Sequence, residues 1–216
     1  MRHTSRPGLA LAALVLTGAL AFGATACGGD DEEASGAGSV EDVEKAFLTG
    51  MVHHHGTAIE MAEIAQERGR NPFIKGLADD IVTTQERETA QMMDIYTRLL
   101  DGELKPDPGA HDGLGLSAEE AGMTHTPETN DMLRTADPFD RAFVDEMVPH
   151  HTGAVKMAEV VLESTKDAEL RKLAEGIIST QEGEIEEMNA FRTEKYGAPV
   201  PEPEGGGGEH GGGHSG

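Results

Sequence analysis

The chain has very few of the residues that cross-link or rigidify a small fold. Its 216 residues include one cysteine and no tryptophan, and aromatic residues make up only 4% of the total. A single cysteine cannot form a disulfide within one chain, so packing or a bound metal must hold the fold together.

Positive charge is also scarce. The chain carries 40 acidic and 17 basic residues, for a formal net charge of −23. Nucleic-acid binding needs the opposite sign, so we predict no nucleic-acid partner. The chain has no basic amphipathic stretch that would favour electrostatic docking on a membrane. An acidic surface attracts cations, although it equally keeps an exported protein soluble.

Long apolar runs are confined to the N-terminus. Arg2, His3 and Arg6 precede the run "GLALAALVLTGALAFGATA", and Cys27 follows it. This layout is typical of an export signal, although the run is nearly long enough to span a membrane.

The residues around Cys27 resemble the lipobox and tether of a bacterial lipoprotein. Three small residues precede Cys27 and the soluble stretch "GGDDEEASGAGS" follows it, although a lipobox more often has leucine in place of Ala24. We predict a signal peptide over residues 1–26, lipidation at Cys27 and a flexible tether over residues 27–39. The mature protein would then be anchored to the outer face of the cell membrane. The alternatives are an ordinary signal peptide with an incidental cysteine, or a retained helix.

Four stretches have the periodicity of amphipathic helices. Their expected bounds are Val40 to Arg68, Pro72 to near Gly102, Pro138 to about Ser164, and about Asp167 to Gly197. The first has Ser39 as a plausible N-cap and Gly69 as a stop. The second and third each open with a capping residue followed by proline, Asn71–Pro72 and Asp137–Pro138.

The segment between the second and third helices is rich in glycine and proline, which argues against a long helix there. Ser117 begins a capping box, and Glu128 to Arg134 has room for a turn or two of helix. Residues 198–216 form a glycine-rich tail with two histidines, which we expect to be flexible.

The chain repeats itself at a spacing of 96 residues. The matched pairs in the first and third helices are Phe47 with Phe143, Met51 with Met147, His54 with His150, His55 with His151, Met61 with Met157 and Glu63 with Glu159. In the second and fourth helices they are Leu77 with Leu173, Ile81 with Ile177, Thr84 with Thr180, Gln85 with Gln181, Glu88 with Glu184 and Met92 with Met188. Residues 40–197 are therefore predicted to be an all-α, ferritin-like four-helix bundle, made of two duplicated hairpins joined by a long crossover.

A helical wheel separates the repeated histidines from the one that does not repeat. His54 and His55 share an arc of about 120° with the methionines, whereas His53 falls on the opposite side. Pro149 takes the place of His53 in the second half and predicts a bend just before His150. Glu88 and Glu184 lie within apolar stripes, where an ionised carboxylate needs a donor or a cation.

The inward faces combine imidazole and thioether groups, which together are ligands for copper. The predicted metal ligands are Met51, His54, His55, Met61, Met147, His150, His151 and Met157, with Met92 and Met188 on the same inward faces. Thioether favours Cu(I), and imidazole accepts Cu(I), Cu(II) or zinc. Four further residues are expected to support the ligand histidines, Glu88 and Glu184 by accepting their far ring protons: Gln85, Glu88, Gln181 and Glu184.

Other interpretations stay open at this point. Methionines at helical spacing often only fill a core, and a buried histidine bonded to a carboxylate is commonly structural. A ferritin-like oxidase with two metals is a further alternative, although its Glu-x-x-His motif is absent from both halves. Six residues outside the repeat are either auxiliary capture sites or incidental: His111, Met123, His125, Met132, His210 and His214.

The motifs "MVHHHGTAIEMAE" and "FDRAFVDEMVPHHTGAVKMAEVV", with the paired "TTQERE" and "STQEGE", resemble the family called domain of unknown function 305. The resemblance covers about Val40 to Tyr196. It implies a ferritin-like bundle, usually exported, with some members linked to copper binding and copper tolerance. The family's methionine and histidine positions match the eight predicted ligands. We therefore expect an anchored protein outside the cell that sequesters or hands over copper, with no catalytic residue assigned.

Overall fold

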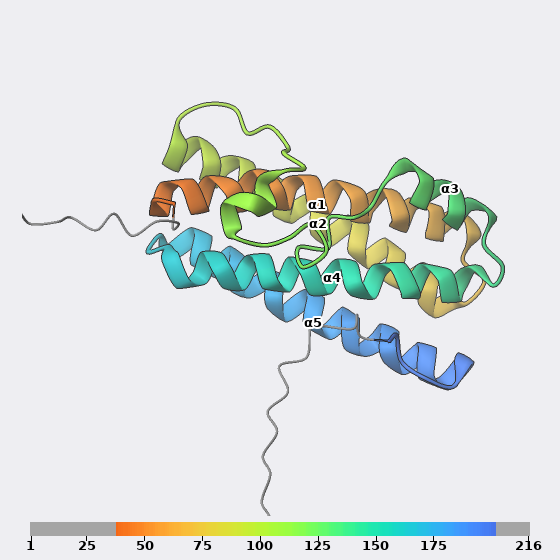
Figure 1. The fold of residues 1–216 in the computed structure, drawn as a ribbon. Coiled ribbons are helices and arrows are strands. Elements are labelled where there is room, and N and C mark those ends of the chain that lie inside the picture. The colour runs from red at the N-terminus through yellow and green to blue at the C-terminus, as the bar shows by residue number, and fades with distance from the viewer. Residues whose placement is uncertain (1–37, 202–216) are drawn as a thin grey trace, which may run out of the picture. The chain divides into compact units, whose positions relative to one another are not determined.

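A computed structural model describes residues 38–201 as helices and loops, with no strand among them. The elements are α1 (Val40–Arg68), α2 (Pro72–Leu100), the 3-10 helix η1 (Ala110–Leu114), α3 (Pro127–Thr135), α4 (Phe139–Ser164) and α5 (Ala168–Tyr196). Figure 1 shows the four long helices and the crossover between α2 and α4. The predicted four-helix bundle is confirmed. The predicted signal peptide, the lipidation site at Cys27 and the tail histidines lie outside the described residues.

Local capping explains where three of the long helices begin. Ser39 and Asp42 form a capping box at the start of α1. The Asn71 side chain accepts a hydrogen bond from the backbone N–H of Phe73, with Pro72 at the first position of α2. Asp167 accepts from the backbone N–H of Leu170 at the start of α5. The capping roles predicted for Ser39 and Asn71 are confirmed.

The start of α4 differs from the prediction. Pro138 occupies the N-cap position, and no side chain caps the helix, so the capping role predicted for Asp137 is wrong. In the first turn of α4, Asp140 instead accepts hydrogen bonds from the backbone N–H groups of Arg70 and Asn71, at 2.9 and 3.0 Å. The start of α4 is therefore held to the α1–α2 loop rather than capped by its own side chain.

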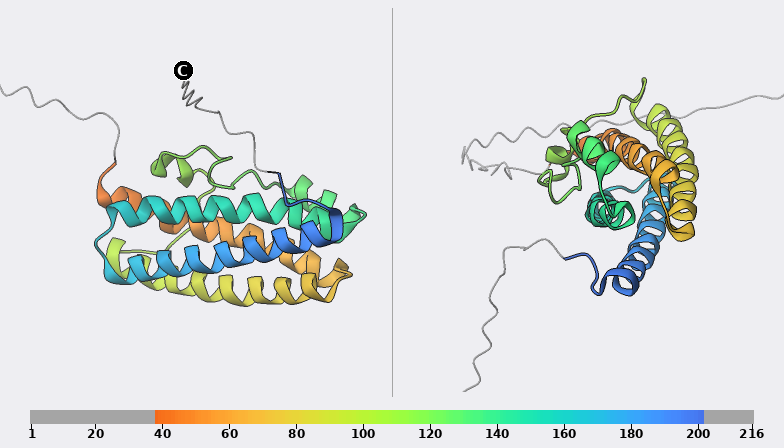
Figure 2. Two further views of the ribbon diagram at one scale, coloured as in Figure 1. Left: turned by 90° about the horizontal axis from the view of Figure 1, so that it is seen from below. Right: turned by 90° about the vertical axis from the view of Figure 1, so that its right-hand side faces the viewer.

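The long helices form two hairpins that pack along each other. α1 packs against α2, α4 packs against α5, and α1 and α4 also lie side by side. Figure 2 shows this arrangement from two further directions, with the crossover on the side of α1 and α4. Helix α4 runs through Pro149 without interruption. No helix within residues 38–201 has the length and apolar character to cross a bilayer.

The crossover is more ordered than its composition suggested. The short helix α3 covers the residues expected to form a turn or two, whereas η1 was not predicted. Ala110, Leu114 and Leu133 bury their side chains against the bundle. Close contact with α4 requires glycine at position 153, because a Cβ there would lie 2.2 Å from backbone atoms of Ala121 and Gly122.

The core consists of two apolar clusters separated by a polar layer. Each long helix contributes to both clusters, because α1 passes from Met51 in one to Ala58 in the other, and the other three helices do the same. The buried polar layer between the clusters contains His54, His55, Gln85, Glu88, His150, His151 and Gln181, with the partly buried Glu184 beside it. A layer of this kind costs free energy unless its polar atoms find partners.

Residues 198–201, assigned to the tail from the sequence, lie against α5. The Arg192 guanidinium donates a hydrogen bond to the carbonyl of Ala198 at 2.7 Å. The backbone N–H of Val200 donates to Oδ1 of Asn189 at 2.9 Å. These two bonds hold the segment along the last turns of the helix.

Candidate metal centre

All eight predicted ligands are buried in the middle of the bundle. Seven of them have no exposed surface, and His150 is 4% exposed. His53, expected to face solvent, is instead half-buried, and burial lowers its pKa. The crossover lies over His53, since Asp107 of that segment is close enough to raise the pKa of His53 and partly offset the effect of burial.

The outer histidine of each pair contacts a carboxylate on the neighbouring helix of its own hairpin. Nε2 of His55 lies 2.9 Å from Oε2 of Glu88. Nε2 of His151 lies 2.7 Å from Oε2 of Glu184. The histidine–carboxylate contacts predicted from the sequence are therefore present in both halves, in the arrangement that commonly orients metal-binding imidazoles.

The other two histidines meet at the centre, between α1 and α4. The rings of His54 and His150 have centroids 3.7 Å apart. Nε2 of His54 lies 3.0 Å from the carbonyl oxygen of His150. Nε2 of His150 lies 2.8 Å from the hydroxyl oxygen of Thr57. The two half-sites therefore touch each other.

These hydrogen bonds decide which ring nitrogen carries the proton. A carbonyl only accepts, so Nε2 of His54 donates. The Thr57 hydroxyl gives its proton to the carbonyl of His54 at 2.8 Å, so its oxygen accepts from Nε2 of His150. The carboxylates likewise accept from Nε2 of His55 and His151.

The Nδ1 atoms of the four rings take no part in these bonds. Each is buried and has no hydrogen-bond partner among the described residues. Burial, followed by the neighbouring histidines, holds the pKa of His54 and His150 well below the ordinary value. A neutral imidazole with one nitrogen donating to the protein and the other free is the form that binds a metal.

Methionine sulfur lies on both sides of the histidine layer. Met51, Met92 and Met157 belong to one apolar cluster, and Met61, Met147 and Met188 belong to the other. Each cluster therefore combines one methionine from α1, one from α4 and one from α2 or α5. Both clusters that border the layer therefore contain thioethers.

Gln85 and Gln181 also face the layer, without the contacts expected of them. Both amide atoms of each side chain are buried and lack a hydrogen-bond partner within residues 38–201. Neither glutamine holds a histidine. Each unpaired buried atom costs about 1–3 kcal/mol, so these amides add to the unsatisfied polar character of the layer.

The role of Thr57 was not predicted from the sequence, because the prediction rested on residues that match in the two halves. The position equivalent to Thr57 in the second half is Gly153. This difference makes the surroundings of the two inner histidines unequal. Thr57 supplies the hydroxyl that holds His150, whereas Gly153 lets the crossover lie on α4. The signal in the sequence was therefore a mismatch within an otherwise repeated motif.

The arrangement does not fit a carboxylate-bridged pair of metals. Over the part of the chain that the structure describes, no three side chains of His, Cys, Asp or Glu lie together as a metal cluster. Glu88 and Glu184 are each bonded to a different histidine. A metal held here would need methionine sulfur in addition to imidazole nitrogen.

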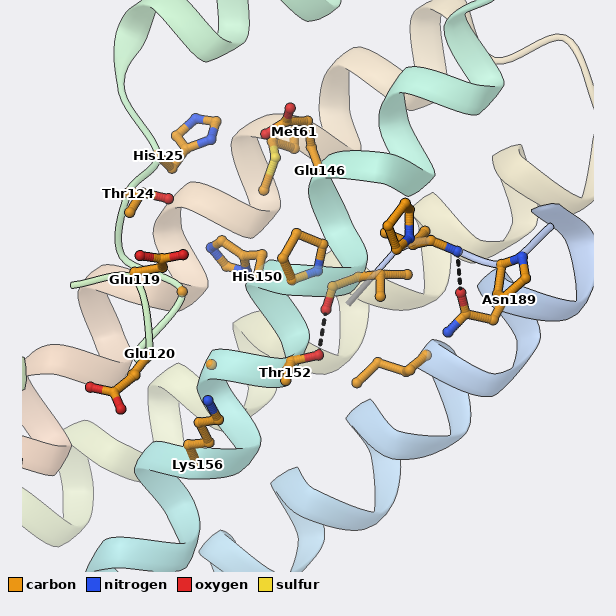
Figure 3. A pocket seen from close by; sticks show the side chains of 18 of the residues that line it. Met61, Glu119, Glu120, Thr124, His125, Glu146, His150, Thr152, Lys156 and Asn189 are labelled. Carbon is orange, nitrogen blue, oxygen red and sulfur yellow. Dashed lines mark hydrogen bonds between the residues drawn. The ribbon is translucent and has the colours of Figure 1, made fainter. Parts of the chain in front are cut away.

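Two pockets approach the layer from outside. The first, which we call the α4 pocket, has a volume of about 1060 Å³ and reaches Met61 and His150. Figure 3 shows these two residues with His125 and Glu146 around one end of it. The second, the α2–α5 groove, has a volume of about 550 Å³ and reaches Glu88.

The four crossover residues proposed as auxiliary ligands have different surroundings. Nδ1 of His111 lies 2.9 Å from the carbonyl oxygen of Leu116, and Met132 is 40% exposed. Met123 packs against the core cluster that contains Met51. Only His125 of these four lines the α4 pocket.

Solved structures with this fold include a copper-binding protein. The Cu(I)-bound form of CopM is 33% identical, with a TM-score of 0.60 over 71% of this chain and 98% of that chain. CopM has also been solved in Ag-bound, apo and Cu(II)-bound forms. A DUF305 fragment from Deinococcus radiodurans is 28% identical, with a TM-score of 0.59 over 69% of this chain and 94% of that chain.

Sequence comparisons agree with the structural ones. A stretch of 56 residues is 38% identical to the uncharacterized protein L153 of Acanthamoeba polyphaga mimivirus, over 26% of this chain. That match spans only 37% of the length of L153, little more than a third. The family model described as domain of unknown function, DUF305, matches residues 44–192. Because this match covers more than half of the chain, the protein belongs to the DUF305 family.

Proposed function

We propose that the protein binds copper in the polar layer of its bundle and thereby sequesters the metal or hands it over outside the cell. The observation that carries the proposal is the set of four buried Nδ1 atoms, each without a partner in the described structure. Nε2 of every one of these rings is already bonded to the protein. Methionine sulfur on both sides of the rings favours Cu(I) among the metals that imidazole accepts. The likeness to CopM, solved with Cu(I), Cu(II) and Ag, supports the same choice.

A histidine network without metal is the competing interpretation. Such a network would be expected to satisfy its own polar atoms. Here the four Nδ1 atoms and the four amide atoms of Gln85 and Gln181 have no partner within residues 38–201. At about 1–3 kcal/mol for each unpaired atom, this is a large penalty for a purely structural layer. The observation favours a site built for a ligand.

Metal titration tests the proposal directly. Purified protein titrated with Cu(I) or Ag(I) against a competing chelator should bind metal, and replacing His54, His55, His150 and His151 by alanine should abolish binding. Replacing His53 and His111 by alanine is the control, because neither residue belongs to the buried polar layer. Unchanged stoichiometry in the fourfold variant would refute the proposal.

Variants that lack the histidines of only one half test whether the two halves form one site. Because the rings of His54 and His150 lie with centroids 3.7 Å apart, we propose that the halves share their metal. Replacing only His54 and His55, or only His150 and His151, should then remove more than half of the binding. A loss of one half in each variant would indicate two independent sites.

We further propose that lipidation at Cys27 anchors the protein to the outer face of the cell membrane. The support is the order of charged residues, apolar run, small residues and cysteine at the N-terminus. Cys27→Ser should move the protein from the membrane fraction to the soluble fraction, and the mass of the mature N-terminus should change by that of the lipid. An unchanged distribution between the fractions would argue against the anchor.

A further inference from the structure

The structure offers two routes from solvent to the buried layer, and they differ in chemistry. The residues that line the α4 pocket include one with a thioether, Met61, and two with imidazoles, His125 and His150. Among the described residues, the α2–α5 groove has neither group, and it is lined by Arg87 and Lys172 together with Glu88, Asp94 and Glu169. Of these two routes, the first offers imidazole and thioether ligands to a copper ion that moves by ligand exchange, and the second does not.

We propose that the α4 pocket is the port through which copper reaches the buried histidines, with His125 as the outer ligand. This inference rests on the copper-binding function proposed above. Transfer would proceed from His125 to Met61 and then to His150, all three of which line the pocket. Charge is conserved, because each step replaces one neutral ligand of the ion by another.

His125 has the properties of a docking ligand rather than a structural residue. Its Nε2 is buried and has no hydrogen-bond partner among the described residues. The ring lines the same pocket as His150. It belongs to the crossover, between η1 and α3, which has no counterpart in the duplicated hairpins. The crossover thus adds a ligand to one half only.

The rim of the pocket is acidic. Glu119, Glu120 and Glu146 line it, and among the described lining residues Lys156 is the only lysine or arginine. Carboxylates around an opening raise the local concentration of cations and speed their arrival. Their attraction is screened as ionic strength rises.

Close backbone packing holds the crossover wall of the pocket in place. A Cβ at Gly122 would lie 2.6 Å from the carbonyl oxygen of His150, and one at Gly153 would lie 2.2 Å from the crossover backbone. Both positions line the pocket. The wall therefore rests directly on the turn of α4 that carries His150.

Blocking the pocket tests the proposal. In a Cys27→Ser background, Thr124→Cys on the pocket wall is labelled with a bulky maleimide, and Cu(I) loading from a bicinchoninate complex is followed by stopped flow. Gln91→Cys, on the wall of the α2–α5 groove, is the matched control. The labelled Thr124→Cys variant should load several-fold more slowly than its unlabelled form, and the labelled Gln91→Cys variant should load at the unlabelled rate. The final stoichiometry should be the same in both.

Two further variants address the outer ligand and the rim. His125→Ala should slow loading several-fold without changing the amount of copper finally bound. Glu119→Gln combined with Glu120→Gln should slow loading by up to about tenfold at low salt, and the difference should shrink at high salt.

Equal loading rates for labelled and unlabelled Thr124→Cys would overturn the port, as would an equal delay from the label on Gln91→Cys. An unchanged rate in His125→Ala would overturn the role of that residue. Failure of the unmodified protein to take up any Cu(I) would instead refute the copper-binding function itself, and the port with it.

Discussion

At the scale of single residues, the hydrogen-bonding partner of each imidazole determines which ring nitrogen is left without a partner, and burial alone does not. Glu88 and Glu184 hold the outer rings, and the inner ring of His150 is held by Thr57. Each partner accepts from Nε2 and leaves Nδ1 free. The inward direction of the four histidines followed from helical periodicity, but the role of Thr57 did not, because its partner His150 lies on another helix.

Thr57→Val should weaken copper binding with little change in volume. Without the hydroxyl, Nε2 of His150 loses its acceptor, and the ring is no longer held in the form with a free Nδ1. Loss of such a partner typically costs about 10- to 100-fold in metal affinity, which a competition titration would measure. Thr49→Val is the control, because the Thr49 hydroxyl bonds only to carbonyls of its own helix. Equal affinities of the two variants would contradict this role of Thr57.

At the scale of the elements, capping residues and glycines decide how the helices and the crossover fit together. Gly153 and Gly183 both lie within long helices, but only Gly153 faces another backbone. Asp167 both caps α5 and pairs with Arg98 at the end of α2. The Asp167 cap was partly readable from the sequence. The contact of Gly153 with the crossover and the pairing of Asp167 with Arg98 depend on packing instead.

Gly153→Ala should destabilise the protein, since its Cβ would meet backbone atoms of the crossover at 2.2 Å. We expect a loss of about 1–3 kcal/mol in the free energy of unfolding, measured with urea. Gly183→Ala should instead gain about 0.5–1 kcal/mol, since nothing lies within 4 Å of its Cβ. A gain in stability in both variants would show that helix propensity, and not the contact with the crossover, dominates at position 153.

Asp167 should make stability depend on acid pH. The hydrogen bonds from Arg98 lower its pKa from 3.8 to about 2, with the backbone N–H of Leu170 contributing. The unfolded chain therefore takes up the proton first as the pH falls, so the stabilisation is present above pH 3.8 and is lost as the pH falls towards 2.

Asp167→Asn keeps a capping side chain but removes the charge. In urea unfolding, the stability difference between the wild type and Asp167→Asn should be constant near neutral pH and should shrink at acid pH. A difference that stays constant over the whole acid range would show that Arg98 does not stabilise the ionised carboxylate.

At the scale of the whole molecule, the duplication builds one polar layer between two apolar clusters. The clusters provide the stability that lets the layer keep atoms without partners. Binding of a ligand to these atoms should therefore act on the whole fold, because all four long helices contribute to the layer.

Copper should raise the midpoint of thermal unfolding. A ligand that binds only the folded state at 100 times its dissociation constant adds about 2.7 kcal/mol to the free energy of unfolding. The midpoint of Cu(I)-loaded protein should fall on addition of a chelator, as followed by circular dichroism. The variant without His54, His55, His150 and His151 serves as the control and should melt at the same temperature with and without metal. A chelator-insensitive midpoint of the loaded wild type would favour the metal-free network.

The sequence by itself determined the helices, the duplication and the inward direction of the repeated residues. These depend on periodicity and on local caps, such as Ser39 and Asn71, which act within a few residues along the chain. A contact between the inward histidines and Glu88 and Glu184 was also readable, because a carboxylate within an apolar stripe needs a donor. Which histidine meets each carboxylate was not.

Only the tertiary structure decided how the two halves meet. The contact of His54 with His150, the acceptor role of Thr57 and the half-burial of His53 all depend on elements far apart in the chain. The same is true of the α4 pocket, which residues of the crossover line together with Met61 and His150. Local propensity carries no information on such contacts, because they form only when separate helices pack together.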